Sequence, residues 1–225
     1  MEVRAVIFDC DGVLLDSEFL VAGTYVEVCR RFGLDVSHAD LRAAIGLQQD
    51  KILRRFTEKT GLSDIPAGLD VALTSEINAK LEADSEPTDG VRAVLTALRA
   101  PFAVASSSSP SRLRLSLGRA GLLPLVEGRV FSATMVARGK PAPDLFLLAA
   151  RELGVAPQDC MVIEDSPFGL QAAVAAGMEP VGYAGGRHLG PEAAPLMRSA
   201  GARHVLAHWR DLPGLAPTLF AEART

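Results

Sequence analysis

Two aspartates, Asp9 and Asp11, directly follow an apolar run at residues 3–8. A near-continuous apolar run of this length is typical of a strand buried on both faces in a parallel sheet. Ligands bind at the carboxyl ends of such strands, where paired carboxylates could ligate a metal, attack an electrophile or transfer protons. Taken alone, the motif is explained more simply by an Asp-Gly turn with an Asx hydrogen bond.

Three further groups of polar residues follow apolar runs in the same way. Ser106 ends the second run and precedes a helix start, whose backbone N–H groups could bind an anion. Lys140 follows the third run and could place a positive charge against a phosphate. Glu164 and Asp165 end the fourth run. Helix capping or plain solvation would account for each of these residues by itself.

Their combination points to a shared site, because the carboxyl ends of parallel strands meet at one edge of a sheet. A cation, a hydroxyl and four carboxylates are then brought together, and the carboxylates would repel one another. A hard divalent cation with oxygen ligands, Mg²⁺, would relieve that repulsion. We therefore predict a Mg²⁺ site from Asp9, Asp11, Glu164 and Asp165, with Lys140 beside it to receive a phosphate.

The elements that must position these residues alternate between strands and helices. Apolar runs are found at residues 3–8, 102–105, 130–131 and 161–163, with a weaker one at 180–183. Helical patterns are found between them at residues 90–98, 111–120, 144–153 and 166–176. This alternation predicts an α/β fold with a doubly wound parallel sheet.

The segment between residues 17 and 86 interrupts that alternation. It contains helical patterns at residues 18–32, 39–44, 50–60 and 70–81, and no convincing buried strand separates them. We therefore predict a helical cap domain, residues 17–86, inserted after the first strand. Residues 1–16 and 87–225 would form the core domain.

The polar residues also resemble the motifs of a known family. The segment DCDGVLLDSE at residues 9–18 resembles the first motif of the haloacid dehalogenase superfamily of phosphotransferases. Ser106, Lys140 with Pro141, and Glu164 with Asp165 resemble the second, third and fourth motifs. Together with the helical segment, the resemblance covers nearly the whole chain. It points to the branch with a helical cap that includes β-phosphoglucomutase and many sugar-phosphate phosphatases.

Within this branch the chain is most similar to bacterial phosphatases of the 6-phosphogluconate type, through FDCDG at residues 8–12 and Ala100-Pro101 before the second strand. The resemblance implies that Asp9 attacks phosphorus and forms an aspartyl-phosphate. Asp11 would protonate the leaving oxygen and then activate water.

The resemblance also implies how the charged groups would be used. Mg²⁺ would be held by the Asp9 carboxylate, the backbone carbonyl of Asp11 and Asp165, with Glu164 as a further candidate. The hydroxyl of Ser106 and the backbone N–H of Ser107 would bind phosphoryl oxygens, and Lys140 would neutralise charge on the phosphoryl group.

The cap would contact the far end of the substrate. Gly46, Gln48 and Gln49 lie in the expected cap loop, where their polarity favours a small hydroxylated phosphate ester over a lipid. The main alternative is a β-phosphoglucomutase-type isomerase, which by resemblance carries a cap histidine and a cap arginine. Val21 and Gln49 stand near those two places, which counts against a mutase.

Three more functions fit the residues less well. A phosphonatase would need a Schiff-base lysine in the cap, for which Lys51 is the candidate, and a dehalogenase would not need Asp11. A non-catalytic phosphometabolite-binding protein would be favoured by loss of the nucleophile, but Asp9 is present.

Composition limits the remaining functions. The 225 residues are 48% hydrophobic and 22% charged, as in an ordinary globular protein. With 27 acidic and 23 basic residues, the net charge of -4 gives no general case for binding nucleic acid or an anionic membrane. Three cysteines without metal-site spacing, and the absence of a signal or membrane-spanning pattern, favour a cytoplasmic protein. We expect a monomer, since one chain supplies both cap and core.

Overall fold

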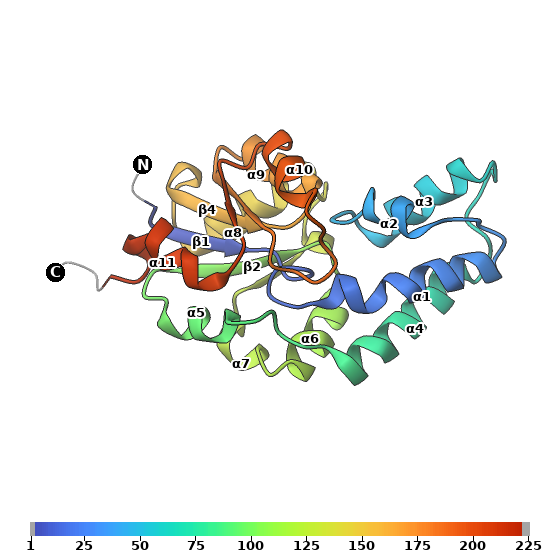
Figure 1. Ribbon diagram of the computed structural model, residues 1–225, viewed down its shortest axis with the longest axis horizontal. Helices are drawn as coiled ribbons and strands as arrows, with labels where there is room; N and C mark the ends of the chain where they lie inside the picture. Colours follow the sequence, from blue (N-terminus) through green and yellow to red (C-terminus); the bar gives the residue numbers. More distant parts are fainter. Residues whose placement is uncertain (1–2, 222–225) are drawn as a thin grey trace.

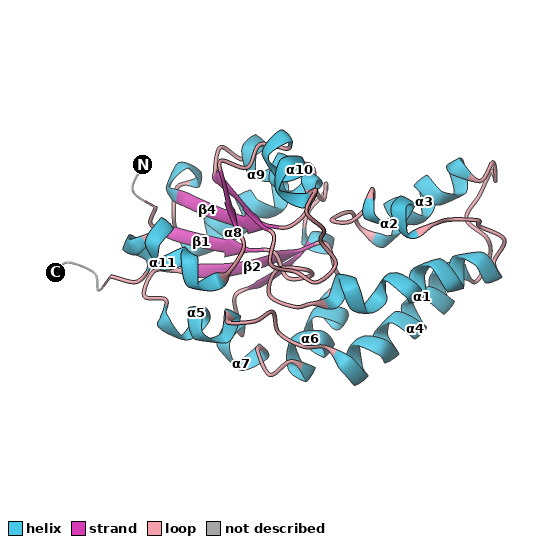
Figure 2. Cartoon of the chain, in the orientation of Figure 1, coloured by secondary structure: helices cyan, strands magenta, loops and turns pink. Residues whose placement is uncertain are grey.

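A parallel sheet of six strands forms the centre of the computed structural model, which describes residues 3–221 (Figures 1 and 2). The strand order is β3-β2-β1-β4-β5-β6. The strands are β1 (Ala5–Phe8), β2 (Phe102–Ser106), β3 (Val130–Ser132), β4 (Cys160–Glu164), β5 (Glu179–Tyr183) and β6 (His204–Leu206). The order reverses between β1 and β4, and this reversal marks where ligands bind in doubly wound sheets.

Helices cover both faces of the sheet because side chains along each strand alternate between the faces. In β1, Val6 and Phe8 belong to one hydrophobic cluster, and Ala5 and Ile7 belong to another. The first cluster includes residues of α5 (Val91–Ala97), α6 (Pro110–Arg119), α7 (Leu123–Val126) and α11 (Leu212–Leu215). The second includes residues of α8 (Asp144–Leu153) and α9 (Pro167–Ala175). Helix α10 (Ala193–Ser199) packs beside α9 and β5, and 3₁₀ turns span Ala133–Met135, Pro157–Asp159, Trp209–Asp211 and Pro217–Leu219.

Four helices lie together beyond the carboxyl edge of the sheet (Figure 1). They are α1 (Ser17–Arg31), α2 (His38–Arg42), α3 (Gln49–Lys59) and α4 (Leu69–Asp84). We call these four helices and their connecting loops the cap. Their apolar side chains form a separate cluster that includes Tyr25, Leu53, Phe56 and Leu73. The domain boundaries at residues 17 and 86 stay a prediction.

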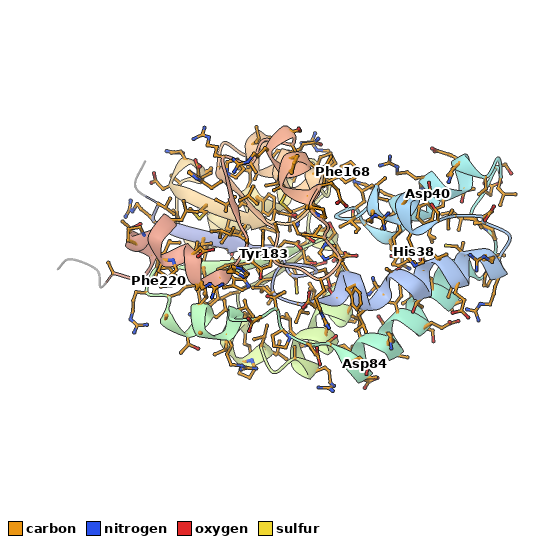
Figure 3. The ribbon with its side chains drawn as sticks, in the orientation of Figure 1. His38, Asp40, Asp84, Phe168, Tyr183 and Phe220 are labelled. Atoms are coloured by element: carbon orange, nitrogen blue, oxygen red, sulfur yellow. The ribbon has the colours of Figure 1, made fainter. Side chains whose placement is uncertain are left out.

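Side chains from the core contact the cap at its base. The backbone N–H of Asp16 donates to the carbonyl of Glu86 at 3.1 Å, which joins the two connections between cap and core. Arg187, in the loop after β5, donates through its backbone to Asp16 at 3.0 Å and through its guanidinium to Glu86 at 3.3 Å. On α9, Phe168 faces the cap (Figure 3), and the Arg55 guanidinium carbon lies 5.6 Å from its ring centroid. The base of the cap is therefore tied to the core at several points.

The structure confirms the predicted α/β fold and doubly wound parallel sheet. Strand β6 and helices α7, α10 and α11 were not predicted. Strand β6 has three residues at the sheet edge, where His204 is exposed, so it lacks the buried apolar run that marks β1, β2 and β4. The four missed elements have at most seven residues, too few to show a clear hydrophobic period. Over residues 3–221, no helix combines the length and apolar character needed to cross a membrane.

Candidate active site

A buried lysine joins the ends of the two central strands. Asp9 directly follows β1, and its backbone N–H donates to the carbonyl of Ile163 in β4 at 2.9 Å. Lys140 is 1% exposed, and its ammonium group donates to Asp9 Oδ1 and, at 2.6 Å, to Glu164 Oε1. Three residues from distant parts of the chain therefore form one charged cluster at the carboxyl edge of the sheet.

The charges in this cluster control one another's protonation. Burial lowers the pKa of Lys140, but the carboxylates of Asp9 and Glu164 outweigh burial and hold that pKa above its usual value. Lys140 is therefore a permanent cation. Burial raises the pKa of Asp9 well above its usual value, and the charges of Glu164 and Asp165 add to that rise, whereas Lys140 opposes it. Asp9 thus depends on nearby positive charge to stay ionised.

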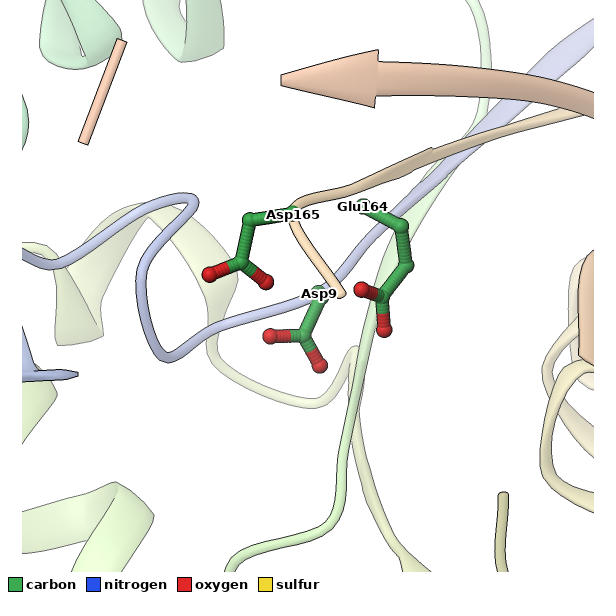
Figure 4. Close-up of side chains that lie close together, drawn as sticks. All are labelled: Asp9, Glu164 and Asp165. Atoms are coloured by element: carbon green, nitrogen blue, oxygen red, sulfur yellow. The ribbon is translucent and has the colours of Figure 1, made fainter. Parts of the chain in front are cut away.

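Three carboxylates lie close enough together to hold a metal ion. Asp9, Glu164 and Asp165 each offer an oxygen within 4.8 Å of the others (Figure 4). Both Glu164 oxygens already accept hydrogen bonds, Oε1 from Lys140 and Oε2 from the backbone and hydroxyl of Ser166 at 2.8 and 2.9 Å. In contrast, Asp165 Oδ2 is buried without a hydrogen-bond partner among the described residues. This oxygen-only donor set fits a hard divalent cation, with Asp9 and Asp165 as the least occupied donors.

A histidine that the sequence analysis did not select lies against Asp165. His188 Nε2 is 2.9 Å from Asp165 Oδ2, although the angles do not make a hydrogen bond, and burial lowers the pKa of the imidazole. Gly12 leaves room for this contact, since a Cβ atom there would lie 2.0 Å from Asp165 Oδ2. His188 follows β5 at the same carboxyl edge, so the rule that pointed to Asp165 could also have pointed to it.

Asp11 lies apart from the three-carboxylate group and is held by serine hydroxyls. Its Oδ2 accepts from Ser108 at 2.8 Å and from Ser106 at 3.1 Å, and its Oδ1 accepts from Ser17 at 2.7 Å. Ser106 ends β2, whereas Ser17 begins the first cap helix. Asp11 is therefore oriented by both the core and the cap, at the point where the chain enters the cap.

The predicted cap residues reach the core through one loop. The carbonyl of Gly46 accepts a hydrogen bond from the Ser107 hydroxyl at 2.7 Å. The φ of Gly46 is 90°, and a Cβ atom there would lie 2.2 Å from Ser166 Oγ, so this position requires glycine. Gln48 lies against the loop that carries Lys140, since a Cβ atom on Gly139 would be 2.5 Å from Gln48 Oε1.

A cavity of about 310 Å³ separates the cap from the carboxyl edge of the sheet. The predicted site residues in its wall are Asp9, Asp11, Ser106, Ser107, Gly46, Gln48 and Gln49. Four ionisable residues that the sequence analysis did not select also line it, namely Glu18, Tyr25, Asp50 and Arg112. Burial, followed by the charge of Asp11, raises the pKa of Glu18 to about 8. The cavity is small, mixed in polarity and open to the Asp9 carboxylate, as expected of a site for a small metabolite.

The fold and this cluster of charges match a known enzyme family. Residues 3–177 match the model of the haloacid dehalogenase-like hydrolases, and the chain belongs to this family. The chain is 27% identical to 6-phosphogluconate phosphatase of Escherichia coli over 95% of its own length and 94% of the relative. It is 36% identical to hexitol phosphatase A of the same organism over 79% of this chain and 81% of the relative.

Solved structures agree with this assignment. The chain is 28% identical to a putative β-phosphoglucomutase from Thermotoga maritima, and the two superpose with a TM-score of 0.70. The match covers 96% of this chain and 99% of the solved structure. The protein is therefore an enzyme of the haloacid dehalogenase-like hydrolase family, in the branch that also contains β-phosphoglucomutase-like proteins.

Proposed function

We propose that this enzyme hydrolyses a small phosphorylated sugar or sugar acid, with Mg²⁺ and through an aspartyl-phosphate on Asp9. The observation that carries this proposal is the position of Asp9, whose carboxylate faces the cavity and accepts a hydrogen bond from the buried ammonium of Lys140. A nucleophilic carboxylate must be ionised, and Lys140 favours that form against the effect of burial. No other carboxylate in the described cavity wall has a lysine partner of this kind.

In the first step, an Asp9 oxygen attacks phosphorus while the bond from phosphorus to the ester oxygen breaks. Asp11 donates a proton to the leaving oxygen, so the alcohol departs neutral. Ser106 and Ser107 line the cavity with Asp11, and the hydroxyl of Ser106 and the backbone N–H of Ser107 would bind the phosphoryl oxygens. Lys140 would balance the negative charge on the phosphoryl group.

In the second step, water attacks the phosphorus of the aspartyl-phosphate, Asp11 takes a proton from that water, and the Asp9 carboxylate is released with inorganic phosphate. The hydroxyls of Ser17 and Ser108 can hold Asp11 in both protonation states, because a hydroxyl can donate or accept. The same side chain can therefore act as acid and then as base without moving.

The site also fits the predicted metal. Asp9, Asp165 and the backbone carbonyl of Asp11 would hold Mg²⁺. The buried Oδ2 of Asp165, which accepts no hydrogen bond among the described residues, supports this arrangement. When bound, the ion would supply positive charge that offsets repulsion between Asp9 and the anionic phosphate. Glu164 would instead position Lys140, because both Glu164 oxygens are already engaged.

The cap residues support a hydrolase over a mutase. Val21, near the place of the mutase histidine, is a buried apolar side chain in the cavity wall. Gln49, near the place of the mutase arginine, is held by hydrogen bonds to Asp70, Thr74 and Arg112. Neither neutral residue would hold a second phosphate well, which counts against a mutase.

A panel of phosphate esters, assayed for free phosphate with and without Mg²⁺, tests the proposal. We expect turnover of roughly 1–100 per second on a good substrate, with release depending on Mg²⁺ and lost in Asp9→Asn. A parallel assay with β-glucose 1-phosphate and a bisphosphate primer tests the mutase alternative. Efficient formation of glucose 6-phosphate with little free phosphate would refute the hydrolase proposal.

A further inference from the structure

One cation in the cavity wall has no role in the chemistry described above. Arg112 lies in the first turns of α6 and is partly buried. Its Nη2 donates to Gln49 Oε1 at 2.8 Å, and its Nε donates to Asn78 Oδ1 at 3.3 Å. Both acceptors belong to cap helices, so the guanidinium lies on the cap side of the cavity, whereas Asp9 lies on the sheet side.

The cap fixes the orientation of this guanidinium. The amide nitrogen of Gln49 donates to Asp70 at 2.7 Å and to Thr74 at 2.8 Å, which leaves its carbonyl oxygen directed at Arg112. The Tyr25 hydroxyl also lies 3.5 Å from that oxygen. Arg112 is thus held in place before any ligand arrives, which lowers the entropic cost of binding one.

Arg112 forms no ion pair with any carboxylate of residues 3–221. Its two hydrogen-bond acceptors, Gln49 and Asn78, are neutral amides. Its charge also acts on Glu18 and Tyr25, which line the same cavity. Removing a guanidinium from water without a counter-ion is unfavourable, and the planar fork of arginine matches a carboxylate. The free donors therefore suit an anionic group on the ligand.

We propose that Arg112 is a specificity residue that binds a carboxylate at the end of the substrate far from the transferred phosphate, so that phosphorylated sugar acids are preferred. This proposal rests on the proposed phosphatase function. A carboxylate carries one negative charge, which a single guanidinium balances, whereas a second phosphate would carry more. The cavity of about 310 Å³ also suits a small, elongated metabolite.

A purely structural role for Arg112, tying α6 to the cap, is the competing explanation. Arg119 provides a matched control because it joins the same helix to the cap outside the cavity. Its Nε donates to the carbonyl of Ala83 in α4 at 2.8 Å, and it does not line the cavity. Arg119→Gln therefore removes a link between cap and core without removing charge from the substrate site.

The test compares two substrates that differ only at one end. 6-Phosphogluconate and glucitol 6-phosphate share their open chain and phosphate, but one ends in a carboxylate and the other in a hydroxymethyl group. We expect the unmodified enzyme to favour the acid by roughly 10- to 100-fold in kcat/KM, as for a hydrogen bond between charged groups. In Arg112→Gln that ratio should fall to about 1, Arg112→Lys should keep part of it, and Arg119→Gln should keep all of it.

Equal kcat/KM values for the two substrates in the unmodified enzyme would overturn the proposal, as would an unchanged ratio in Arg112→Gln. Calorimetric binding to Asp9→Asn separates this proposal from the phosphatase function, since it needs no turnover. Selective binding of 6-phosphogluconate that depends on Arg112, without phosphate release by the unmodified enzyme, would refute the phosphatase and retain the role of Arg112. Phosphate release by the unmodified enzyme without a preference for 6-phosphogluconate would support the phosphatase function and refute the role of Arg112.

Discussion

Replacing Lys140 by methionine should destabilise the protein strongly as well as inactivate it. The side chain is 1% exposed and is the shared cation of two buried carboxylates, Asp9 and Glu164. Removing one partner from a buried ion pair typically costs about 3–5 kcal/mol, because the remaining charge is left without compensation. For a chain of this length, that loss corresponds to a fall of about 6–20 °C in Tm.

Urea unfolding in EDTA, followed by tryptophan fluorescence, would measure this loss. The sequence has one tryptophan, Trp209, which is buried and stacked on Tyr183 at 4.4 Å, so its emission reports on the core. Lys80→Met is the matched control, because Lys80 pairs with Asp84 on an exposed helix face at 2.7 Å. That control should change the free energy of unfolding by less than about 0.5 kcal/mol.

The destabilisation should depend on pH in a defined direction. Burial raises the folded-state pKa of Asp9 above its unfolded value, and loss of Lys140 removes the charge that opposes this rise. The unfolded chain then ionises at lower pH than the folded chain, so stability falls as pH rises between the two pKa values. The difference in the free energy of unfolding between Lys140→Met and the unmodified protein should therefore grow from acidic to neutral pH.

Adding Glu164→Gln to Lys140→Met should recover part of the lost stability, since it removes one of the uncompensated charges. Unfolding free energies for Lys140→Met and the unmodified protein that agree within about 1 kcal/mol at neutral pH would refute the reasoning, because the buried cation would then contribute no more than a surface one.

Three other predictions follow from the site. Asp9→Asn should retain the circular dichroism spectrum of the folded protein but lose phosphate release, and a rate near that of the unmodified enzyme would exclude Asp9 as the nucleophile. Excess EDTA should abolish activity and added Mg²⁺ should restore it, so full turnover in EDTA would contradict the metal assignment. Gly46→Ala should lower the free energy of unfolding by about 1–3 kcal/mol, because the backbone at Gly46 is left-handed and the added Cβ atom would clash with Ser166. It should also lower activity. Gly33→Ala, with a φ of 85° but open space around it, should cost less stability and spare activity.

Much of the site could be predicted from the sequence, because its residues lie at the ends of strands. Asp9, Ser106 and Asp165 each end or directly follow a buried apolar run, and the carboxyl ends of parallel strands lie at one edge whatever the rest of the chain does. Local sequence therefore sufficed to group these residues. The long helical segments of the cap were predictable for another reason, because no buried apolar run of the kind that forms a strand interrupts them.

Other features depend on contacts between distant residues and were decided by the tertiary structure. Lys140 and Asp9 are separated by 131 positions, and Lys140 pairs with Asp9 and Glu164 because β1 packs beside β4. Asp11 was expected to hold the metal through its backbone carbonyl, and that stays a prediction. Its carboxylate is directed at Ser106, which ends β2, and at Ser17 of α1.

Arg112 is the clearest example of a residue whose place in the site could not be predicted from the sequence. Its helical pattern was visible in the sequence, yet nothing local distinguished it from a solvated arginine such as Arg114. Its position in the cavity wall follows from how the cap rests on α6, which brings Gln49 and Asn78 to its guanidinium. A sequence determines which side chains follow each strand and which helices have an apolar face. Which charges are paired, and which are left free for a ligand, is decided by the packing of cap against core, because hydrogen bonds and desolvation act over a few ångströms in space rather than along the chain.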